Sequence, residues 1–384
     1  MAVSPAPYFT EDFSIRLDNL LFIVCEELQI SGTRYRLAEE RYHAIARYLE
    51  ADGSPFNRYK PEIYPQGSMR LNTTVKPVKG PHDLDFVLQL SVHYELYRDP
   101  LKLINSLYEY MCQSGLYRLM TTKMNRCVRV EYKDDFYMDI VPACCNPDVP
   151  GTCLMVPDRQ AKDWKDSNPK GYATWFDRKA LVVASDGSAQ IMAKAQPIPE
   201  QQAVAEKRPL QLAVQLFKRW RDVRYTDEPE LGPISIVLTT LAADYYGGEG
   251  SVSQALNTVL RKIVGRIDEA DAERRRVLVL NPTNGNEDLS ERWDEYPERY
   301  TAFKAGIREF QRQWSTVLAK KGNVSTDLEK LFGEPVKKAY TMQAQRVQKD
   351  RSTSSLGISG SGMIVPATSS IPAVPRNTFY GEEK

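Results

Sequence analysis

A glycine-serine turn followed by two acidic strands restricts the architecture of this chain more than any other feature. Residues 64–90 read YPQGSMRLNTTVKPVKGPHDLDFVLQL, and a further acidic strand, FYMDIVPA, follows about fifty residues later. The pattern places Asp83 and Asp85 on one strand and Asp139 on another. The three carboxylates can act together only if the two strands are neighbours in the fold.

Asp83 and Asp85 lie two residues apart on a predicted strand, so their side chains point to the same face. Carboxylates this close repel each other unless cations lie between them. Mg²⁺ is the expected cation because it prefers hard oxygen ligands and keeps water and substrate phosphate in its shell. With Asp139 completing the ligand set, two ions can activate a 3′-hydroxyl and neutralise leaving pyrophosphate. The pattern therefore predicts nucleotidyl transfer; solvated acids at a strand end are the alternative.

The residues before the acidic strand are of the kinds that bind a phosphate group. Gly67 and Ser68 follow Gln66 and lie sixteen residues before Asp83. Glycine lets the backbone approach a phosphate closely, and the serine hydroxyl and backbone amides can donate hydrogen bonds to it. Gly-Ser pairs are common in turns, so the position of this pair relative to the acids carries the prediction.

Two residues of the C-terminal half are candidates for a clamp on the γ-phosphate. Lys218 lies on a predicted helix over residues 209–224, at the edge of its apolar stripe. Ser235 is expected three residues into a helix that opens at residues 232–233, near the positive end of the helix dipole. A surface lysine and an ordinary helix serine are the alternatives. Other basic and aromatic residues that could line a nucleotide cleft are Arg70, Lys76, Lys79, Arg126, Arg129, Trp164, Tyr172, Trp175 and Phe176.

Overall charge and hydrophobicity exclude several classes of protein. The 51 Lys and Arg residues nearly balance the 50 Asp and Glu residues, so no global basic field indicates a constitutive nucleic-acid binder. The longest apolar run, residues 20–24, is too short to span a bilayer, and the first residues lack the layout of a signal peptide. We therefore expect a cytoplasmic protein without a membrane span.

The six cysteines include no Cys-x-x-Cys pair, so the sequence indicates no disulfide framework. Cys144, Cys145 and Cys153 are close in sequence, and three thiolates with a histidine could hold zinc. The three histidines, at positions 43, 82 and 93, lie outside that cluster. Buried reduced thiols are therefore the favoured interpretation, although the sequence leaves zinc binding open.

Periodicity predicts an α+β protein of two lobes. Residues 1–60 should form helices that brace both lobes, with helices at 10–30 and 33–49 and a C-terminal cap at Ser31-Gly32. Residues 61–204 should form a catalytic core with a mixed sheet. Its predicted elements are strands at 84–90, 127–132 and 136–142, a helix at 101–114, and then loops with one short helix at 172–179. Residues 205–350 should form a helical lobe with helices at 209–224, 233–246, 252–271, 293–320 and 325–349.

The last segment differs in composition. Residues 351–384 are rich in Ser, Thr, Gly, Ala and Pro and contain few apolar residues, so we expect a disordered tail. Its end, VPRNTFYGEEK, places two aromatic residues after a flexible spacer. A short recognition peptide and an end without function are both consistent with this composition.

The phrases QGS, DLD and MDIVP resemble the DNA polymerase β-like nucleotidyltransferases. Longer phrases over residues 10–345 narrow the resemblance to the bacterial CD-NTases, relatives of the animal cyclic GMP-AMP synthase: VPDRQAKDWKDSNPKGYATWF, KRW, GPIS and NPTNGNEDLSERW. The resemblance implies a nucleotidyltransferase core packed against a helical lobe, with the active site in the cleft between them. It assigns Asp83, Asp85 and Asp139 to two Mg²⁺ ions, and Gln66, Gly67, Ser68, Lys218 and Ser235 to the nucleotide.

The resemblance also implies an activity and partners. Family members condense nucleoside triphosphates, ATP often among them, into cyclic di- or trinucleotides that signal in anti-phage defence (CBASS). Some have tails that are handled by a ubiquitin-like ligase, and others act with peptide-clamping regulators. Position 138 is Met where the zinc thumb of the animal enzyme would need a nearby histidine, which argues against a zinc thumb and, with the balanced charge, against DNA activation. Two rival functions stay open: transfer to an RNA end, protein or small molecule, and an inactive nucleotide-binding scaffold whose tail recruits partners.

Overall fold

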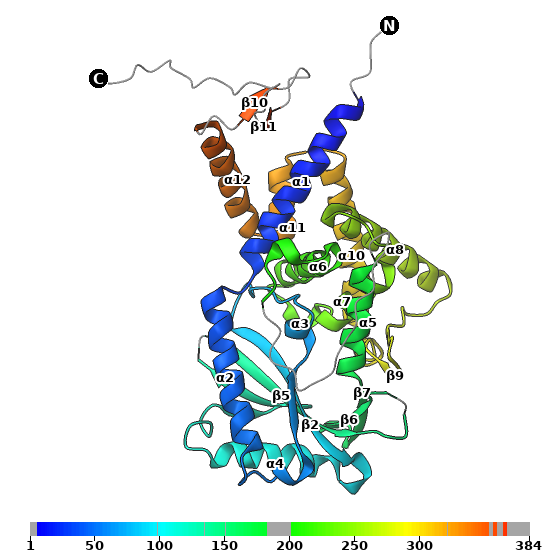
Figure 1. Ribbon diagram of the computed structural model, residues 1–384. Coiled ribbons are helices and arrows are strands. Elements are labelled where there is room, and N and C mark those ends of the chain that lie inside the picture. Colours follow the sequence, from blue (N-terminus) through cyan, green and yellow to red (C-terminus); the bar gives the residue numbers. More distant parts are fainter. Residues whose placement is uncertain are drawn as a thin grey trace, which may run out of the picture.

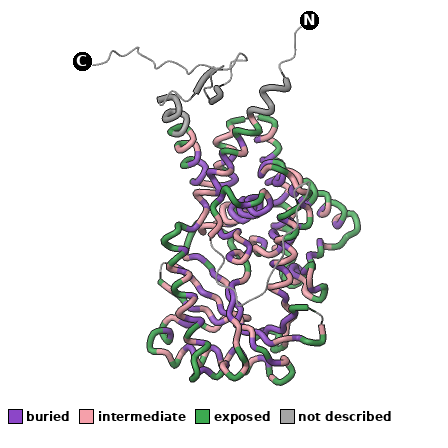
Figure 2. Tube along the Cα trace, viewed as in Figure 1, coloured by how far each residue is buried: buried purple, intermediate pink, exposed green. Residues whose placement is uncertain are grey.

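The computed structural model describes residues 6–97, 99–133, 135–149, 151–182, 201–320, 322–352, 356–358 and 364–366. Within these ranges the chain forms two lobes, one built around a sheet and one built from helices (Figure 1). Each lobe has its own large apolar core. Buried segments gather inside both lobes in Figure 2, most densely along helix α6 (Pro209–Arg224). The predicted α+β class with a separate helical lobe is confirmed.

The sheet lobe contains seven strands. They are β1 (Glu62–Pro65), β2 (His82–His93), β3 (Thr121–Lys123), β4 (Val128–Tyr132), β5 (Phe136–Cys145), β6 (Leu154–Asp158) and β7 (Asp163–Ser167). The order along the main path is β1-β2-β5-β4-β3, and β6 pairs with β5 and β7. Strands β2 and β5 are parallel, whereas the other paired strands are antiparallel. The sheet is therefore mixed, and its two longest strands are neighbours.

Helices α2 (Gly32–Glu50) and α4 (Pro100–Gln113) cover one face of this sheet, and the opposite face is directed toward the helical lobe. Helix α2 and η1 (Asn57–Tyr59) precede β1, and α3 (Gly67–Arg70), η2 (Tyr94–Leu96) and α4 lie between later strands. Apolar side chains of α2 and α4 pack with alternate residues of β2, β4 and β5 in one core. Because side chains alternate along a strand, the residues between these core positions face the opposite side. That opposite side carries the acidic residues.

The helical lobe is assembled from segments far apart in the sequence. Its elements are α1 (Ala6–Leu28), α5 (Pro169–Leu181), η3 (Val204–Glu206), α6, η4 (Pro229–Leu231), α7 (Ser235–Tyr245), α8 (Val252–Ala272), β8 (Leu280–Asn281), β9 (Asn284–Asp288), α9 (Arg292–Glu295), α10 (Pro297–Leu318), α11 (Val324–Phe332) and α12 (Pro335–Ser352). Helices α1 and α5 belong to this core, although the sequence placed α5 with the catalytic lobe. None of the described helices is long and apolar enough to cross a membrane.

Several predicted boundaries were wrong for identifiable reasons. Ser31 does not cap the first helix at its C-terminus; it is the N-cap of α2 and accepts a hydrogen bond from the Arg34 amide. The helix predicted at 293–320 is divided into α9 and α10 at Pro297, which lacks the N–H that would continue a helix. The helix predicted at 325–349 is divided at Gly333, whose φ is +71°. Ser235 begins α7 rather than lying three residues into it.

The region after residue 143 contains more regular structure than loops with one helix. β5 extends to Cys145, and β6 and β7 form an antiparallel pair beside it. The strand pattern is weak here because β7 reads DWKDS and carries almost no apolar residues. In the predicted tail, residues 351–352 end α12, and β10 (Leu356–Ile358) pairs with β11 (Ile364–Pro366). The other tail residues lie outside the described ranges.

Removing the aromatic centre of the helical lobe should destabilise it. Phe310 is fully buried and stacks on Trp220 at 4.8 Å between ring centroids, with Phe217 and Phe332 edge-on. We expect Phe310→Ala to lower the free energy of unfolding by about 3–5 kcal/mol because it leaves a cavity. Urea denaturation followed by tryptophan fluorescence would measure this. Leu119→Ala is the control, since that side chain is 89% exposed; equal losses in both variants would contradict the expectation.

Candidate active site

Strand pairing brings the three predicted acids to one place. In the parallel register of β2 and β5, Asp85 is paired with Asp139, and Asp83 with Tyr137. Leu84 and Met138, which alternate with the acids, are buried in the core of the sheet lobe. The acids therefore point away from that core, toward the helical lobe. This placement follows from the period of two along each strand and from the register between them.

The acids open into a cavity of about 330 Å³ between the lobes. Seven of the eight residues that the sequence assigned to catalysis or nucleotide binding line it: Gly67, Ser68, Asp83, Asp85, Asp139, Lys218 and Ser235. They come from the sheet lobe and from α6 and α7 of the helical lobe. The eighth, Gln66, instead lines the adjacent cavity described below. The structure thus places residues that are more than 150 positions apart in the sequence around one space.

The glycine-serine turn lies directly against the acidic strand. Gly67 has a φ of +56°, a conformation that L side chains rarely adopt, and a Cβ there would lie 2.9 Å from Oδ2 of Asp85. The preceding amide of Gln66 donates to the Asp85 carbonyl oxygen over 2.8 Å. The glycine is therefore required both by the backbone conformation and by the space that Asp85 occupies.

The acids repel one another at this position. Burial, together with the charges of Asp139 and Asp83, raises the pKa of Asp85 to about 7, although Lys218 opposes the shift. Among the described residues, no three His, Cys, Asp or Glu side chains are arranged closely enough in this structure to hold one ion. A cation from the protein occupies the space between two of the acids instead.

That cation is Arg129 of β4, which lies opposite Asp139 in the antiparallel register. Its Nε and one terminal nitrogen donate to the two oxygens of Asp139 over 2.7 and 2.8 Å, and the same terminal nitrogen is 3.4 Å from Asp83. The guanidinium also lies over the ring of Tyr137, 4.5 Å from its centroid. Arg129 therefore neutralises part of the acidic cluster. The sequence offered it only among several scattered basic residues.

The helical lobe supplies basic groups to the same cavity. Lys218 is buried and donates to the carbonyl oxygen of Thr73 over 3.0 Å, and burial lowers its pKa to about 8. One turn later on α6, Arg221 donates to the Ser235 hydroxyl over 2.5 Å and pairs with Asp222. Arg221 was missed in the sequence, although its spacing of three from Lys218 puts both on one face of a helix.

A second cavity of about 500 Å³ adjoins the first. Gly67, Leu71, Asp85 and Ile236 line both, so the two spaces meet at the acidic strand. The second cavity extends between β7, α5 and the β8–β9 hairpin with the loop after it. Together the cavities provide a charged end beside the acids and a larger space beyond it.

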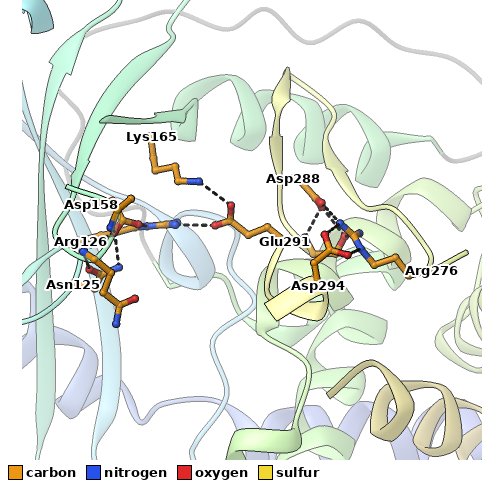
Figure 3. Close-up of polar contacts among 11 residues, drawn as sticks. Asn125, Arg126, Asp158, Lys165, Arg276, Asp288, Glu291 and Asp294 are labelled. Atoms are coloured by element: carbon orange, nitrogen blue, oxygen red, sulfur yellow. Dashed lines mark hydrogen bonds and ion pairs between the residues drawn. The ribbon is translucent and has the colours of Figure 1, made fainter. Parts of the chain in front are cut away.

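Ion pairs join the two lobes beside the second cavity. Glu291, just before α9, accepts from Arg126 over 2.8 Å and from Lys165 over 2.9 Å, both of the sheet lobe (Figure 3). Arg126 also binds Asp158 of β6 over 2.7 Å. On the helical-lobe side of the close-up, Arg276 pairs with Asp288. The polar groups of Glu291, Arg126 and Lys165 are therefore already engaged with one another.

The cysteine cluster is not arranged as a metal site. Cys144 lies in the core of the sheet lobe, whereas Cys145 follows it on β5 and donates to the Leu90 carbonyl oxygen. Adjacent residues of a strand point to opposite faces, so these two thiols do not converge. Cys153 is also buried. Within the described residues the structure agrees with reduced structural thiols.

Comparison with known proteins gives a consistent result over most of the chain. The profile of the Second Messenger Oligonucleotide or Dinucleotide Synthetase domain matches residues 17–179. A c-di-GMP synthase of Roseivirga ehrenbergii is 32% identical over 382 residues, which cover 97% of this chain and 99% of that protein. The cyclic dinucleotide synthase CdnG of Bradyrhizobium diazoefficiens is 24% identical over 316 residues, or 76% of this chain and 74% of that protein.

Solved structures show the same fold. The structure of the Bradyrhizobium diazoefficiens CdnG in complex with GTP matches with a TM-score of 0.70 and 23% identity, over 86% of this chain and 99% of that chain. The structure of the Vibrio cholerae cyclic AMP-GMP synthase DncV, in complex with the linear intermediate 5′ pppA(3′,5′)pG, matches with a TM-score of 0.53 and 14% identity. The match covers 88% of this chain and 93% of that chain. The chain belongs to the bacterial CD-NTases of the nucleotidyltransferase superfamily.

Proposed function

We propose that this protein is a cyclic dinucleotide synthase that joins two molecules of GTP into c-di-GMP and releases two molecules of pyrophosphate. The observation that carries the proposal is the cavity in which Asp83, Asp85 and Asp139 face the Gly67-Ser68 turn. The 32% identity to a c-di-GMP synthase over nearly the whole chain supports the choice of GTP and of a two-membered ring. The resemblance implies ATP among the substrates of the family, and ATP is therefore the competitor to be tested.

The three acids fit divalent ions in their chemistry. They are hard oxygen ligands on neighbouring strands. The charges of Asp139 and Asp83 disfavour the ionised form of Asp85, and Arg129 lies against Asp139 where a metal cation would be expected. Mg²⁺ is the ion we expect, because it keeps sites for water and substrate phosphate. Bound there, two ions would lower the pKa of the attacking hydroxyl and neutralise the leaving pyrophosphate.

The other residues of the cavity would bind and orient the triphosphate. Gly67 lets the backbone approach a phosphate, and Ser68 adds a hydroxyl donor. Lys218 and Arg221 supply positive charge from α6, and Arg221 holds Ser235 at the start of α7. A 3′-hydroxyl oxygen then attacks the α-phosphorus, the bond to the bridging oxygen breaks, and pyrophosphate leaves. A second transfer within the linear intermediate closes the ring.

The biological setting is part of the same proposal. A cyclic dinucleotide is a diffusible signal, and its synthesis suits the anti-phage role that the resemblance implies. Handling of the tail by a ubiquitin-like ligase or a peptide-clamping regulator stays an expectation, since most of residues 351–384 lies outside the described part of the chain. Transfer to an RNA end, a protein or a small molecule is the rival activity, and the product distinguishes it.

The activity itself is tested with α-labelled triphosphates. We expect the full chain with Mg²⁺ and GTP to form a phosphatase-resistant product whose mass is that of c-di-GMP. The variant carrying both Asp83→Asn and Asp85→Asn should lose at least about a thousandfold in rate, because it removes ligands of the expected ions. Unchanged melting temperature would show that it folds. A product with a free 3′-hydroxyl or a terminal phosphate, or full activity of the double variant, would refute the proposal.

The Gly67 turn gives a second prediction. Gly67→Ala places a methyl group 2.9 Å from Asp85 Oδ2 and strains the backbone at a φ of +56°. We expect the rate of product formation to fall by about a hundredfold while the fold persists, because a displacement near 1 Å at a reacting centre has about this cost. Gly53→Ala is the matched control, since its Cβ meets nothing within 4 Å. Equal activity of the two variants would show that the close approach is unimportant.

The position of Arg129 predicts a change in metal binding that can be measured without catalysis. Removing the guanidinium should make the acidic cluster more attractive to a divalent ion, because the hydrogen bonds to Asp139 no longer compete. We expect Arg129→Met to bind Mn²⁺ about tenfold more tightly in the absence of nucleotide, measured by electron paramagnetic resonance titration. Arg70→Met is the control, because Arg70 pairs with Asp177 instead. Unchanged or weaker Mn²⁺ binding in Arg129→Met would contradict this competition.

A further inference from the structure

The second cavity contains a charge arrangement that the proposed function does not explain. The cavity meets the catalytic one at Gly67 and Asp85, so any nucleotide held by the acids extends into it. Its ligand therefore carries several negative charges. Even so, the carboxylates of Asp166 and Glu287 face this cavity. Acidic groups in a site for a polyanion call for a part of the ligand that donates hydrogen bonds.

Several other charged groups beside the cavity are engaged in ion pairs. Glu291 binds Arg126 and Lys165 with its two oxygens, and Asp288 pairs with Arg276 (Figure 3). Arg126 and Lys165 are thus unavailable as partners for the remaining acids. Within the described residues, those two acids keep oxygens that no protein donor occupies.

Glu287 is held firmly and still has one oxygen to offer. Its Oε2 accepts from the Asn281 amide over 2.7 Å, and Oε1 has no hydrogen-bond partner among the described residues. Asp166 accepts only a long contact, 3.4 Å, from the side-chain amide of Asn284. Burial raises the pKa of Glu287, and the charge of Asp166 adds to the shift. Hydrogen-bond donors from a ligand would relieve this unfavourable charge.

The walls of the cavity suit a flat ring. Trp164 of β7, Ile236 of α7 and Leu289 after β9 contribute aromatic and aliphatic surface to the same lining. A nucleobase is neutral, planar and carries its donors and acceptors on its edge, so it needs flat apolar contacts and polar groups in one plane. The catalytic cavity, by contrast, is lined by the acids and by Lys218 and Arg221. The division between the cavities matches that between a base and a triphosphate.

We infer that the Glu287 carboxylate, with Asp166 beside it, reads the N1–H and 2-amino donors of a guanine base in the second cavity and thereby selects GTP over ATP. This inference rests on the proposed function and adds the residues that choose the base. Glu287 Oε1 and the neighbouring Asp166 carboxylate together offer acceptors for two adjacent donors, and guanine presents such a pair. Adenine presents the acceptor N1 on the same edge, which an ionised carboxylate repels. A site built for donors rejects a ligand that lacks them, because its acceptors are left unpaired.

The test compares three bases by equilibrium binding. The probes are α,β-methylene analogues of GTP, ITP and ATP, which cannot release pyrophosphate; inosine lacks the 2-amino group of guanine. We expect the full chain to bind the GTP analogue about tenfold more tightly than the ITP analogue and to bind the ATP analogue most weakly. In Glu287→Gln, the preference for GTP over ATP should fall by about ten- to a hundredfold, and GTP and ITP should become equal within about twofold.

Two further variants complete the design. Glu291→Gln is the control, because residue 291 lies four positions after Glu287 and the variant also removes one carboxylate of the cavity. The oxygens of Glu291 are engaged by Arg126 and Lys165. We therefore expect this variant to preserve the order of the three probes. Asp166→Asn should weaken the discrimination between GTP and ITP in the same direction as Glu287→Gln. It keeps the inference testable if Glu287→Gln does not fold.

The outcomes separate this inference from the proposed function. If the wild-type chain makes c-di-GMP but Glu287→Gln and Asp166→Asn keep the wild-type order of the probes, the inference is wrong and the function stands. If no nucleotide product forms, yet discrimination against ITP and ATP is lost in Glu287→Gln, the inference holds as base recognition and the function fails. Equal binding of all three probes by the wild-type chain would overturn the inference directly.

Discussion

The parallel pairing of β2 and β5 is the constraint on which the rest of the site depends. It sets Asp85 beside Asp139 and turns both away from the core of the sheet lobe. A shift of one residue in this register would turn the acids of one strand into the apolar core. The buried residues that alternate with the acids oppose such a shift. The energy that fixes the catalytic geometry thus comes largely from apolar packing on the opposite face of the sheet.

The helical lobe is attached to this sheet through the same segment that forms the phosphate turn. Gln211, Gln215 and Lys218, spaced along one face of α6, donate to the carbonyl oxygens of Leu71, Thr74 and Thr73. These bonds are buried, so breaking them would leave unpaired polar groups in the interior. The backbone that follows Gly67-Ser68 is therefore fixed from the helical side and the acids from the sheet side. On the far side of the cleft, Glu291 joins the lobes through Arg126 and Lys165.

Electrostatics divides the cleft into two parts. Beside the acidic strand, Arg129, Lys218 and Arg221 balance the carboxylates, and the arrangement is suited to exchanging protein cations for metal ions and phosphate. Beyond Leu71 and Ile236, Glu291 is paired with Arg126 and Lys165, and Asp166 and Glu287 share the cavity with apolar side chains. In the proposed reaction, a single nucleotide would span both parts, with its charge at one end and its base at the other. This arrangement would separate the residues that carry out the chemistry from those that select the base.

Local patterns in the sequence determined the strands that carry Asp83, Asp85 and Asp139, the helix at 209–224 and the resemblance to the CD-NTases, because each depends on spacing within one short segment. The weakly apolar strand β7 was missed because its pairing with β6 decided it. The breaks at Pro297 and Gly333 have local causes that the apolar period does not register. The partners of Arg129, Arg221 and Glu291 were fixed only in the tertiary structure. Whether a charged side chain faces solvent, an acid or a cavity depends on strand register and on contacts between distant residues, such as Arg126 and Glu291, which are 165 positions apart. No local period encodes such contacts.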